Sequence, residues 1–249
     1  AETICSLLYN ELKLNPEVVI EPTSGLGNFI KAALNTFSTI KKIVGVEINP
    51  EYCDECQKRI SDDRLHIVND NFFTYKIEKY VGETETLFLG NPPWATNSEL
   101  NFNLPEKENF KRLSGTDAIT GASNFDICEY IILKLIEKSV NKNVAIAMLC
   151  KTSVARNVLL ELDRNDVCVD DLRIYNFDSS KVFGISAPAC LLYIKMSTSN
   201  SKCRECEVYD IETPNTISGR ISFQNGKLSN LDDDVLDLAF AASDTQEAN

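Results

Sequence analysis

Four consecutive residues, Asn91-Pro92-Pro93-Trp94, carry groups suited to bind a planar molecule with an amino group. Consecutive prolines hold the backbone extended and lack N–H donors, so nearby carbonyl oxygens stay free as acceptors. The side-chain carbonyl of Asn91 and the main-chain carbonyl of Pro92 could bind both hydrogens of one amino group and direct its lone pair towards an electrophile. Trp94, the only tryptophan of the chain, offers a face for stacking a base. The alternative is a proline-stiffened loop with a packing tryptophan.

A second group of residues, Glu21-Pro22-Thr23-Ser24-Gly25-Leu26-Gly27, lies between a predicted strand and a predicted helix. Its glycines let the backbone approach a ligand, and the helix start presents free N–H groups. Alone, this spacing is also typical of an ordinary turn, and it lacks the third glycine of the dinucleotide fingerprint. Glu47 ends the next predicted strand and could accept hydrogen bonds from both hydroxyls of a ribose. Together the two features predict a ligand that contains a nucleoside.

A third feature follows the next predicted strand. Asp70 could accept a hydrogen bond from the amino group of an adenine, and Phe72 or Phe73 could wall the same pocket. The other phenylalanine is expected to pack in the core.

The elements that would position these residues alternate along the chain. Apolar strands are predicted at residues 18–21, 43–47, 65–68, 86–89, 144–149, 172–177 and 189–194, and helices at 28–37, 51–60, 125–139 and 153–162. This order predicts an α/β fold with a doubly wound, seven-stranded and mostly parallel sheet. Residues 184–188 show no helical pattern and are too few for a crossover helix, so the last strand is expected to be antiparallel.

Composition limits the possible classes of protein. The chain has 249 residues, of which 43% are hydrophobic, so a core can form and global disorder is excluded. No run approaches the about 20 apolar residues of a membrane span. With no leader and no initiator methionine, we expect a cytoplasmic piece of a longer gene product. Residues 1–195 are predicted to form the main domain, and 196–249 a small acidic appendage with a hairpin at Asn225-Gly226.

The motifs together resemble class I S-adenosylmethionine-dependent methyltransferases, specifically those that methylate amino groups of nucleic acid and carry an (Asn/Asp)-Pro-Pro-aromatic signature. The motif order is similar to the gamma arrangement of adenine-specific DNA methyltransferases in restriction–modification systems. The resemblance covers about residues 1–195. It implies a Rossmann-like fold, S-adenosylmethionine as cofactor, and methyl transfer to adenine in double-stranded DNA after the base is flipped out.

The resemblance also implies a role for each matching residue. Catalysis would fall to Asn91, Pro92, Pro93 and Trp94, and no metal is expected. The cofactor would contact Glu21, Thr23, Gly25 and Gly27 near its methionine, Glu47 at its ribose, Ile48, Asp70 and Phe72 around its adenine, and Asn91. Trp94 and Phe183 would stack on the target base. Trp is less usual than Tyr or Phe in that motif. In the family, the helix before the glycine segment usually opens with a Thr-Pro-type segment that touches the methionine; because the chain begins inside that helix, the contacts of this segment are not expected.

The charge of the chain argues against strong DNA binding by these residues alone. There are 25 basic and 37 acidic residues, a net charge of −12, whereas phosphate contacts require clustered Lys and Arg. The candidate cations are scattered: Lys107, Lys111, Arg112, Lys151 and Arg156. We therefore expect duplex recognition to reside in a domain or subunit outside this chain.

Other interpretations stay open at this point. Methyltransferases of RNA adenine and of protein glutamine use similar motifs, and an inactive, cofactor-binding scaffold subunit is a further alternative. A nicotinamide oxidoreductase is disfavoured, because the third glycine and a proton relay are missing. The nine cysteines are expected to be reduced thiols. Two pairs, Cys53/Cys56 and Cys203/Cys206, could form a zinc site, but the predicted sheet places them on opposite flanks.

Overall fold

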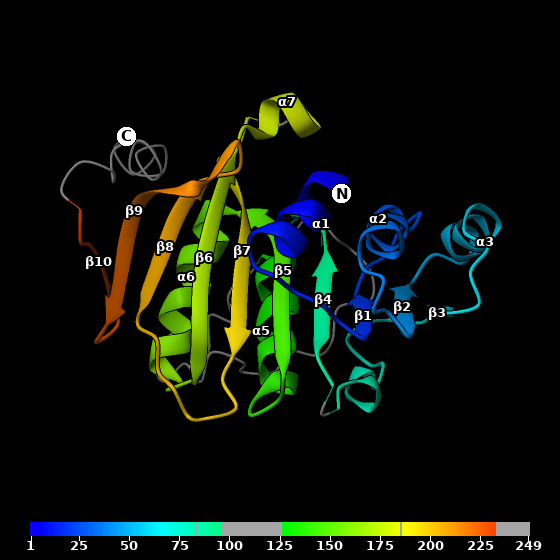
Figure 1. Cartoon of the computed structure of the whole chain (residues 1–249), viewed down its shortest axis with the longest axis horizontal. Helices are drawn as coiled ribbons and strands as arrows, with labels where there is room; N and C mark the ends of the chain where they lie inside the picture. The colour runs from blue at the N-terminus through cyan, green and yellow to red at the C-terminus, as the bar shows by residue number, and fades with distance from the viewer. Residues whose placement is uncertain (83, 96–125, 185, 233–249) are drawn as a thin grey trace.

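The computed structural model describes residues 1–82, 84–95, 126–184 and 186–232, whose strands form one ten-stranded sheet (Figure 1). The strands are β1 (Val18–Glu21), β2 (Lys42–Glu47), β3 (Leu65–Asn69), β4 (Thr86–Gly90), β5 (Val144–Lys151), β6 (Val169–Phe177), β7 (Ala189–Met196), β8 (Glu205–Asp210), β9 (Thr213–Gln224) and β10 (Lys227–Asn230). The helices are α1 (Glu2–Asn10), α2 (Asn28–Thr36), α3 (Pro50–Arg59), the 3-10 helix η1 (Ile77–Tyr80), α5 (Ile127–Ser139), α6 (Thr152–Arg164) and α7 (Ser179–Phe183). Within the described residues, none of these helices has the length and apolar character needed to cross a bilayer.

The structure confirms the predicted doubly wound arrangement. The strand order is β10-β9-β8-β6-β7-β5-β4-β1-β2-β3, and the five strands from β5 to β3 pair in parallel. Apolar residues of α1, α2 and α3 cover one face of the sheet, and those of α5 and α6 cover the other (Figure 1). β7 lies antiparallel between β5 and β6, as the short connection before it predicts.

The predicted number of seven strands is wrong, because the residues after 196 continue the same sheet. β8 pairs in parallel with β6, and β9 and β10 follow as antiparallel strands. Their buried residues pack into the cluster on the α5–α6 side; these are Cys206, Val208, Ile221 and Phe223. They alternate with polar residues over short runs, which is a weak signal in a sequence.

The hairpin predicted at Asn225-Gly226 is confirmed. Both residues have positive φ, +55° and +71°, and they connect the antiparallel pair of Gln224 and Lys227. Positive φ at both central residues is the geometry that Asn-Gly favours in two-residue hairpins.

Local polar residues mark where helices begin. Asn49 caps α3 by accepting a hydrogen bond from the Glu51 backbone N–H at 2.9 Å. Asp126 caps α5 by accepting one from Cys128 N–H at 2.9 Å. The helix predicted from residue 125 therefore begins at Ile127, and residue 125 lies outside the described residues. The five-residue α7 was not predicted, since it is too short to show a helical period.

The topology brings the predicted motifs to one edge of the sheet. Parallel strands have their carboxyl ends on the same side, and here β1, β2, β4 and β5 end at Glu21, Glu47, Gly90 and Lys151. α1 and α7 lie at this same edge (Figure 1). The segments after these strands therefore form the place where a ligand can be bound.

The packing around Gly27 generates a stability prediction. Gly27 has φ +76°, and an added Cβ would lie 2.4 Å from Cys56 Sγ on α3. We expect Gly27→Ala to lower the free energy of unfolding by about 2–4 kcal/mol, through overpacking and a strained backbone. Gly184 is the matched control: its φ is +69° and nothing lies within 4 Å of an added Cβ, so Gly184→Ala should cost about 1 kcal/mol. Urea denaturation measures both; equal losses would contradict the packing argument.

Candidate functional site

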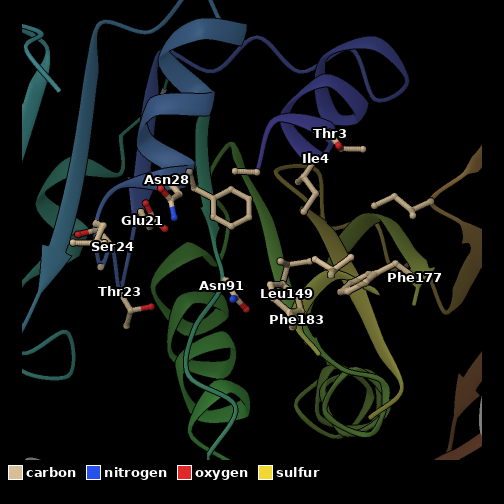
Figure 2. Close-up of a pocket in the computed structure, with 16 residues that line it drawn as sticks. Thr3, Ile4, Glu21, Thr23, Ser24, Asn28, Asn91, Leu149, Phe177 and Phe183 are labelled. Atoms are coloured by element: carbon tan, nitrogen blue, oxygen red, sulfur yellow. The ribbon is translucent and has the colours of Figure 1, made fainter. Parts of the chain in front are cut away.

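A cavity of about 400 Å³ lies at the edge of the sheet where the parallel strands end, a size typical of small-molecule sites. Figure 2 shows that its two sides differ. One side, here called the polar half, is lined by Glu21, Thr23, Ser24, Gly25 and Asn28. The other side, the apolar half, is lined by Leu149, Phe177, Val182, Phe183 and Ile211. Asn91 lies between the labelled residues of the two halves (Figure 2).

Glu21 is the most unusual residue of the polar half. Its side chain is 4% exposed, and its Oε2 atom has no hydrogen-bond partner among the described residues. Burial raises the pKa of the Glu21 carboxyl group well above its ordinary value; a hydrogen bond from the Ile30 backbone N–H offsets part of this rise, and the nearby charge of Glu47 adds to it. A buried carboxyl group with a free oxygen is a group prepared for a cationic or hydrogen-bond-donating ligand.

Two hydroxyl groups beside Glu21 are also without partners among the described residues. These are Oγ1 of Thr23 and Oγ of Ser24, both buried, and both residues line the cavity. Leaving a buried polar atom unpaired costs about 1–3 kcal/mol. Three such oxygens, on residues 21, 23 and 24 that all line one cavity, favour a polar ligand that could complete their hydrogen bonds.

Glycine is needed at positions 25 and 27 for two different physical reasons. Gly25 has φ +50° and open space where a Cβ would be, so a ligand can approach its backbone. Gly27 does not line the cavity, and its missing side chain gives room to Cys56. The structure therefore assigns to Gly27 a packing requirement that sequence spacing alone does not reveal.

Glu47 joins the glycine segment to the end of β2. Its Oε2 accepts a hydrogen bond from Gly25 N–H at 2.7 Å, and its Oε1 accepts one from Asn49 N–H at 2.8 Å. The carboxylate is thus already oriented by two backbone amides, while each oxygen keeps a further lone pair. Glu47 is not among the residues that line the 400 Å³ cavity.

Three other predicted cofactor residues also lie outside this cavity. Ile48 exposes 49% of its surface beside Glu47, which is unusual for an isoleucine that follows a buried strand. Asp70 is exposed, and its Oδ1 accepts a hydrogen bond from Asn71 N–H at 2.7 Å. Phe72 is buried in the core and meets Phe73 edge to face at 5.5 Å between ring centroids.

The predicted motif after β4 is held by contacts at its end. The side chain of Asn91 is exposed and lines the cavity, whereas Pro92 is buried and Pro93 is exposed. Trp94 is half-buried, and its indole Nε1–H donates a hydrogen bond to the Leu149 carbonyl at 3.2 Å. A tyrosine or phenylalanine has no N–H at that place. The hydrogen bond therefore gives a physical reason for tryptophan in this motif.

Phe183 contacts Trp94 directly, whereas the resemblance implies that the two rings lie on opposite faces of a target base. The centroids are 5.4 Å apart and the planes are 80° apart, an edge-to-face contact. Phe177 packs on Phe183 in the same way, at 6.0 Å. A base fits between two aromatic faces only when they are parallel and spaced by its thickness. The Phe183 ring would have to turn away from Trp94 before a base could be sandwiched.

The cavity also contains residues that sequence reasoning missed. Ala1, Thr3 and Ile4 of the α1 region line it, although no motif of the sequence marks them. Ile211 comes from the turn between β8 and β9, far from any recognised motif. Its contribution depends on the sheet order, which the sequence pattern did not show.

The two cysteine pairs lie where the predicted sheet puts them. Cys53 and Cys56 are on α3, beside the β2–β3 end of the sheet, and Cys203 and Cys206 are at β8, towards the other end. The described residues contain no group of three or more His, Cys, Asp or Glu side chains arranged to hold a metal ion.

Comparison with known proteins gives one clear sequence relative. The chain is 38% identical to the type II methyltransferase M.NspV from Nostoc sp. (strain ATCC 29411 / PCC 7524) over 238 residues, which are 92% of this chain and 49% of the relative. The chain thus spans about half the length of that curated relative. No protein-family model matches the chain.

Solved structures agree on the fold. The M protein of the type I restriction enzyme EcoKI superposes with a TM-score of 0.57 at 15% identity, over 84% of this chain and 46% of that chain. A protein from Listeria monocytogenes that is assigned to the class I S-adenosylmethionine-dependent methyltransferases superposes with a TM-score of 0.51 at 10% identity, over 86% of this chain and 64% of that chain. The predicted methyltransferase-like α/β fold is confirmed by these likenesses.

The buried carboxyl group of Glu21 generates a pH prediction. Because its pKa is raised in the folded chain, the folded state holds the proton to higher pH, and stability falls as pH rises from the ordinary value of about 4.3 towards the raised one. Glu21→Gln cannot ionise, so its free energy of unfolding relative to wild type should increase between about pH 5.5 and pH 8. Urea denaturation at both pH values measures this difference.

Glu55 on α3 supplies the matched control, since its side chain is exposed. Glu55→Gln should show the same small difference from wild type at both pH values. A Glu21→Gln difference that is also independent of pH would contradict the account of this carboxyl group.

Proposed function

We propose that this chain is the methyl-transfer core of a DNA methyltransferase, which uses S-adenosylmethionine to methylate the exocyclic amino group of adenine as the modification part of a restriction–modification system. The observation that carries the proposal is the position of Asn91 between the polar and apolar halves of one cavity. The 38% identity to a type II methyltransferase supports it.

The polar half suits the methionine end of S-adenosylmethionine. The unpaired carboxyl oxygen of Glu21 can bind the positively charged part of the cofactor. The hydroxyls of Thr23 and Ser24 can bind its amino and carboxylate groups. The open space at Gly25 admits the ligand to the backbone. When bound, the cofactor supplies a methyl group activated by a sulfonium charge.

The adenosine end of the cofactor would extend from Gly25 towards the end of β2. Glu47, already oriented by two backbone amides, would accept hydrogen bonds from the ribose hydroxyls. The exposed face of Ile48 would pack on the cofactor adenine, Asp70 would accept from its amino group, and Phe72 would close the pocket from the core side. Gly27 supports this arrangement through its packing on α3.

Asn91 and Pro92 would hold the target amino group. An adenine amino nitrogen is a weak nucleophile, since its lone pair is delocalised into the ring. Two carbonyl acceptors that bind its hydrogens orient this lone pair and stabilise the positive charge that develops on the nitrogen. With the leaving group already activated, no general base of low pKa is needed.

Phe183, together with Trp94, would receive the target base at the apolar half. Trp94 does not itself line the cavity but contacts Phe183, which does. A base within a duplex cannot reach this cavity and must be flipped out, at a cost of a few kcal/mol. Stacking on an aromatic face returns about 1–3 kcal/mol per base. Phe183 would give up its edge contact with Trp94 and cover the second face of the base.

Recognition of duplex DNA would reside outside this chain. The net charge of −12 is unfavourable for phosphate binding. Of the scattered cations, Lys151 pairs with Asp126 at 3.1 Å, while Lys107, Lys111 and Arg112 lie outside the described residues. A target-recognition segment in the other half of a longer protein, or in a partner subunit, would supply the missing positive charge.

Transfer of a labelled methyl group tests the proposal directly. Purified chain with labelled S-adenosylmethionine, at high protein concentration and low salt so that weak DNA binding suffices, is offered DNA, RNA and a glutamine-containing peptide, and the products are digested and separated. N6-methyladenine from DNA is the expected product. Label in RNA adenine or in glutamine, or cofactor binding without transfer to any acceptor, would overturn the assignment to DNA.

Asn91 generates the first functional prediction. Asn91→Ala should abolish methyl transfer and leave the Kd for S-adenosylmethionine nearly unchanged, because it removes an acceptor for the target rather than the carboxyl and hydroxyl groups of the polar half. Asn91→Asp keeps a side-chain acceptor and should retain measurable activity. Calorimetry and the labelled-methyl assay give the two readings; transfer at the wild-type rate by Asn91→Ala would refute its role.

Trp94 generates a second functional prediction. Trp94→Ala should lower kcat/KM on duplex DNA more than on DNA whose target base is mismatched, since flipping costs less there. Trp94→Phe keeps a stacking face but loses the hydrogen bond to Leu149, and should lie between wild type and Trp94→Ala. Steady-state kinetics on the two substrates decide the matter, and equal losses on both would exclude a stacking role.

A further inference from the structure

The turn between β8 and β9 contributes a residue to the cavity, although β8 lies several strands away from β1 in the sheet. Ile211, the residue that follows β8, lines the cavity together with Phe177, Val182 and Phe183. In Figure 1 this turn lies at the same edge of the sheet as α1 and α7. The residues after 196 thus contribute to the candidate site as well as to the sheet.

The strand order decides which half of the cavity Ile211 belongs to. β1 and β2 carry the polar segments, β4 carries Asn91, and β5, β6 and β8 lie on the other side of β4. A side chain that follows β8 is therefore separated from the glycine segment by the width of several strands. Ile211 lies on the side of Asn91 that is opposite to Glu21.

Short-range contacts fix the position of this turn. The Ile211 backbone N–H donates to the Asn176 carbonyl at 2.9 Å, and Glu212 N–H donates to Asp210 Oδ1 at 2.8 Å. Before the turn, the ring of Tyr209 stacks on the buried ring of Tyr175 at 5.0 Å with 19° between the planes. These contacts hold the backbone of the turn, and therefore the side chain of Ile211, in a defined position.

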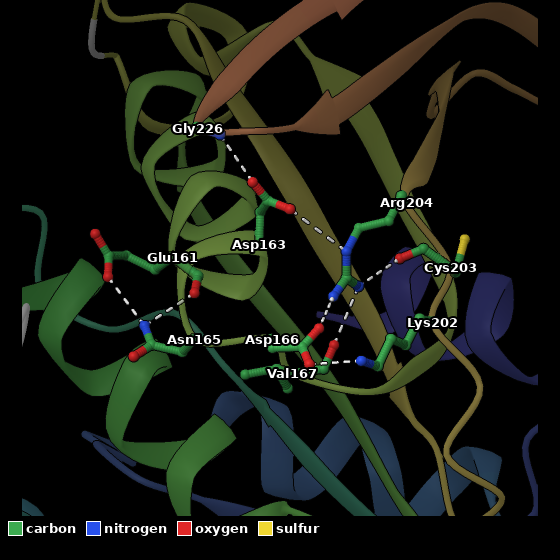
Figure 3. Close-up of polar contacts among 9 residues, drawn as sticks. All are labelled: Glu161, Asp163, Asn165, Asp166, Val167, Lys202, Cys203, Arg204 and Gly226. Carbon is green, nitrogen blue, oxygen red and sulfur yellow. Dashed lines mark hydrogen bonds and ion pairs between the residues drawn. The ribbon is translucent and has the colours of Figure 1, made fainter.

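A second set of contacts ties the other end of these strands to α6. Figure 3 shows Arg204 between two carboxylates, Asp163 at 3.6 Å and Asp166 at 3.3 Å. Arg204 also donates to the Val167 carbonyl at 3.1 Å, and Gly226 N–H donates to Asp163 Oδ2 at 2.8 Å. β8, β9 and β10 are thus held to the core at both ends.

We infer that Ile211 is a specificity-determining residue of the apolar half, which packs against the target nucleoside and limits the space beside Phe183. This inference rests on the proposed function and deepens it. The neighbours of Ile211 in the cavity are apolar or aromatic, and 60% of the Val182 surface is exposed beside them. Such a surface binds the carbon face of a planar base rather than the charged methionine of the cofactor.

Kinetics with Ile211→Ala test the inference. Loss of three side-chain carbons from contact with the nucleoside should lower kcat/KM for DNA about five- to tenfold, with the Kd for S-adenosylmethionine unchanged. Ile211→Val, which keeps most of the volume, should recover most of the activity. Ile217→Ala is the control, because Ile217 is on β9 of the same hairpin, is partly exposed, and does not line the cavity.

The possible outcomes separate this inference from the proposed function. If wild type methylates DNA and Ile211→Ala matches it, the inference is wrong and the proposed function stands. If Ile211→Ala weakens S-adenosylmethionine binding as much as it weakens DNA methylation, Ile211 belongs to the cofactor side and the inference is wrong. A wild-type chain that transfers no methyl to DNA overturns the proposed function, and the role of Ile211 with it.

Discussion

The carboxyl group of Glu21 is enclosed at the end of β1, and one of its oxygens has no hydrogen-bond partner among the described residues. Burying such a group is unfavourable unless it stays protonated or meets a cation. The hydroxyls of Thr23 and Ser24 share this state, so the first turn after β1 carries a local cost that packing does not relieve. A ligand with positive charge and hydrogen-bond donors would relieve it. Gly25 and Asn91 line the same cavity, and the N–H of Gly25 helps to orient Glu47.

The other parts of the site lie at the ends of the neighbouring strands. Towards β2, the segments after the parallel strands offer oxygen acceptors to a polar ligand. Towards β5, β6 and β8 they offer aromatic and aliphatic side chains. Asn91 follows the strand between these regions, and the hydrogen bond from Trp94 to Leu149 fixes the end of its motif to β5. One edge of one sheet thus places unpaired oxygen atoms and an apolar surface on the two sides of Asn91, an arrangement that fits the group transfer proposed above.

Much of this was predictable from sequence, and what was not has definite physical causes. Buried parallel strands are continuous apolar runs, so the sheet around Glu21, Glu47 and Asn91 could be read directly. β8 and β9 have short alternating patterns, and their partners are set by long-range pairing; the ten-stranded sheet and the place of Ile211 were therefore missed. Gly27 and Phe183 show a second limit. The glycine pattern points to Gly27 and the family resemblance to Phe183, but the contact with Cys56 and the edge-to-face ring geometry exist only in the folded chain.

The central claim is that the buried carboxyl group of Glu21 binds the positively charged part of S-adenosylmethionine. Calorimetry of S-adenosylmethionine binding, in two buffers with different enthalpies of ionisation, tests it most directly, because a cation beside a protonated carboxyl group displaces its proton. Wild type should release protons on binding, so that the observed heat changes with the buffer, and Glu21→Gln should show a smaller change or none. A wild-type heat that is the same in both buffers would contradict the claim.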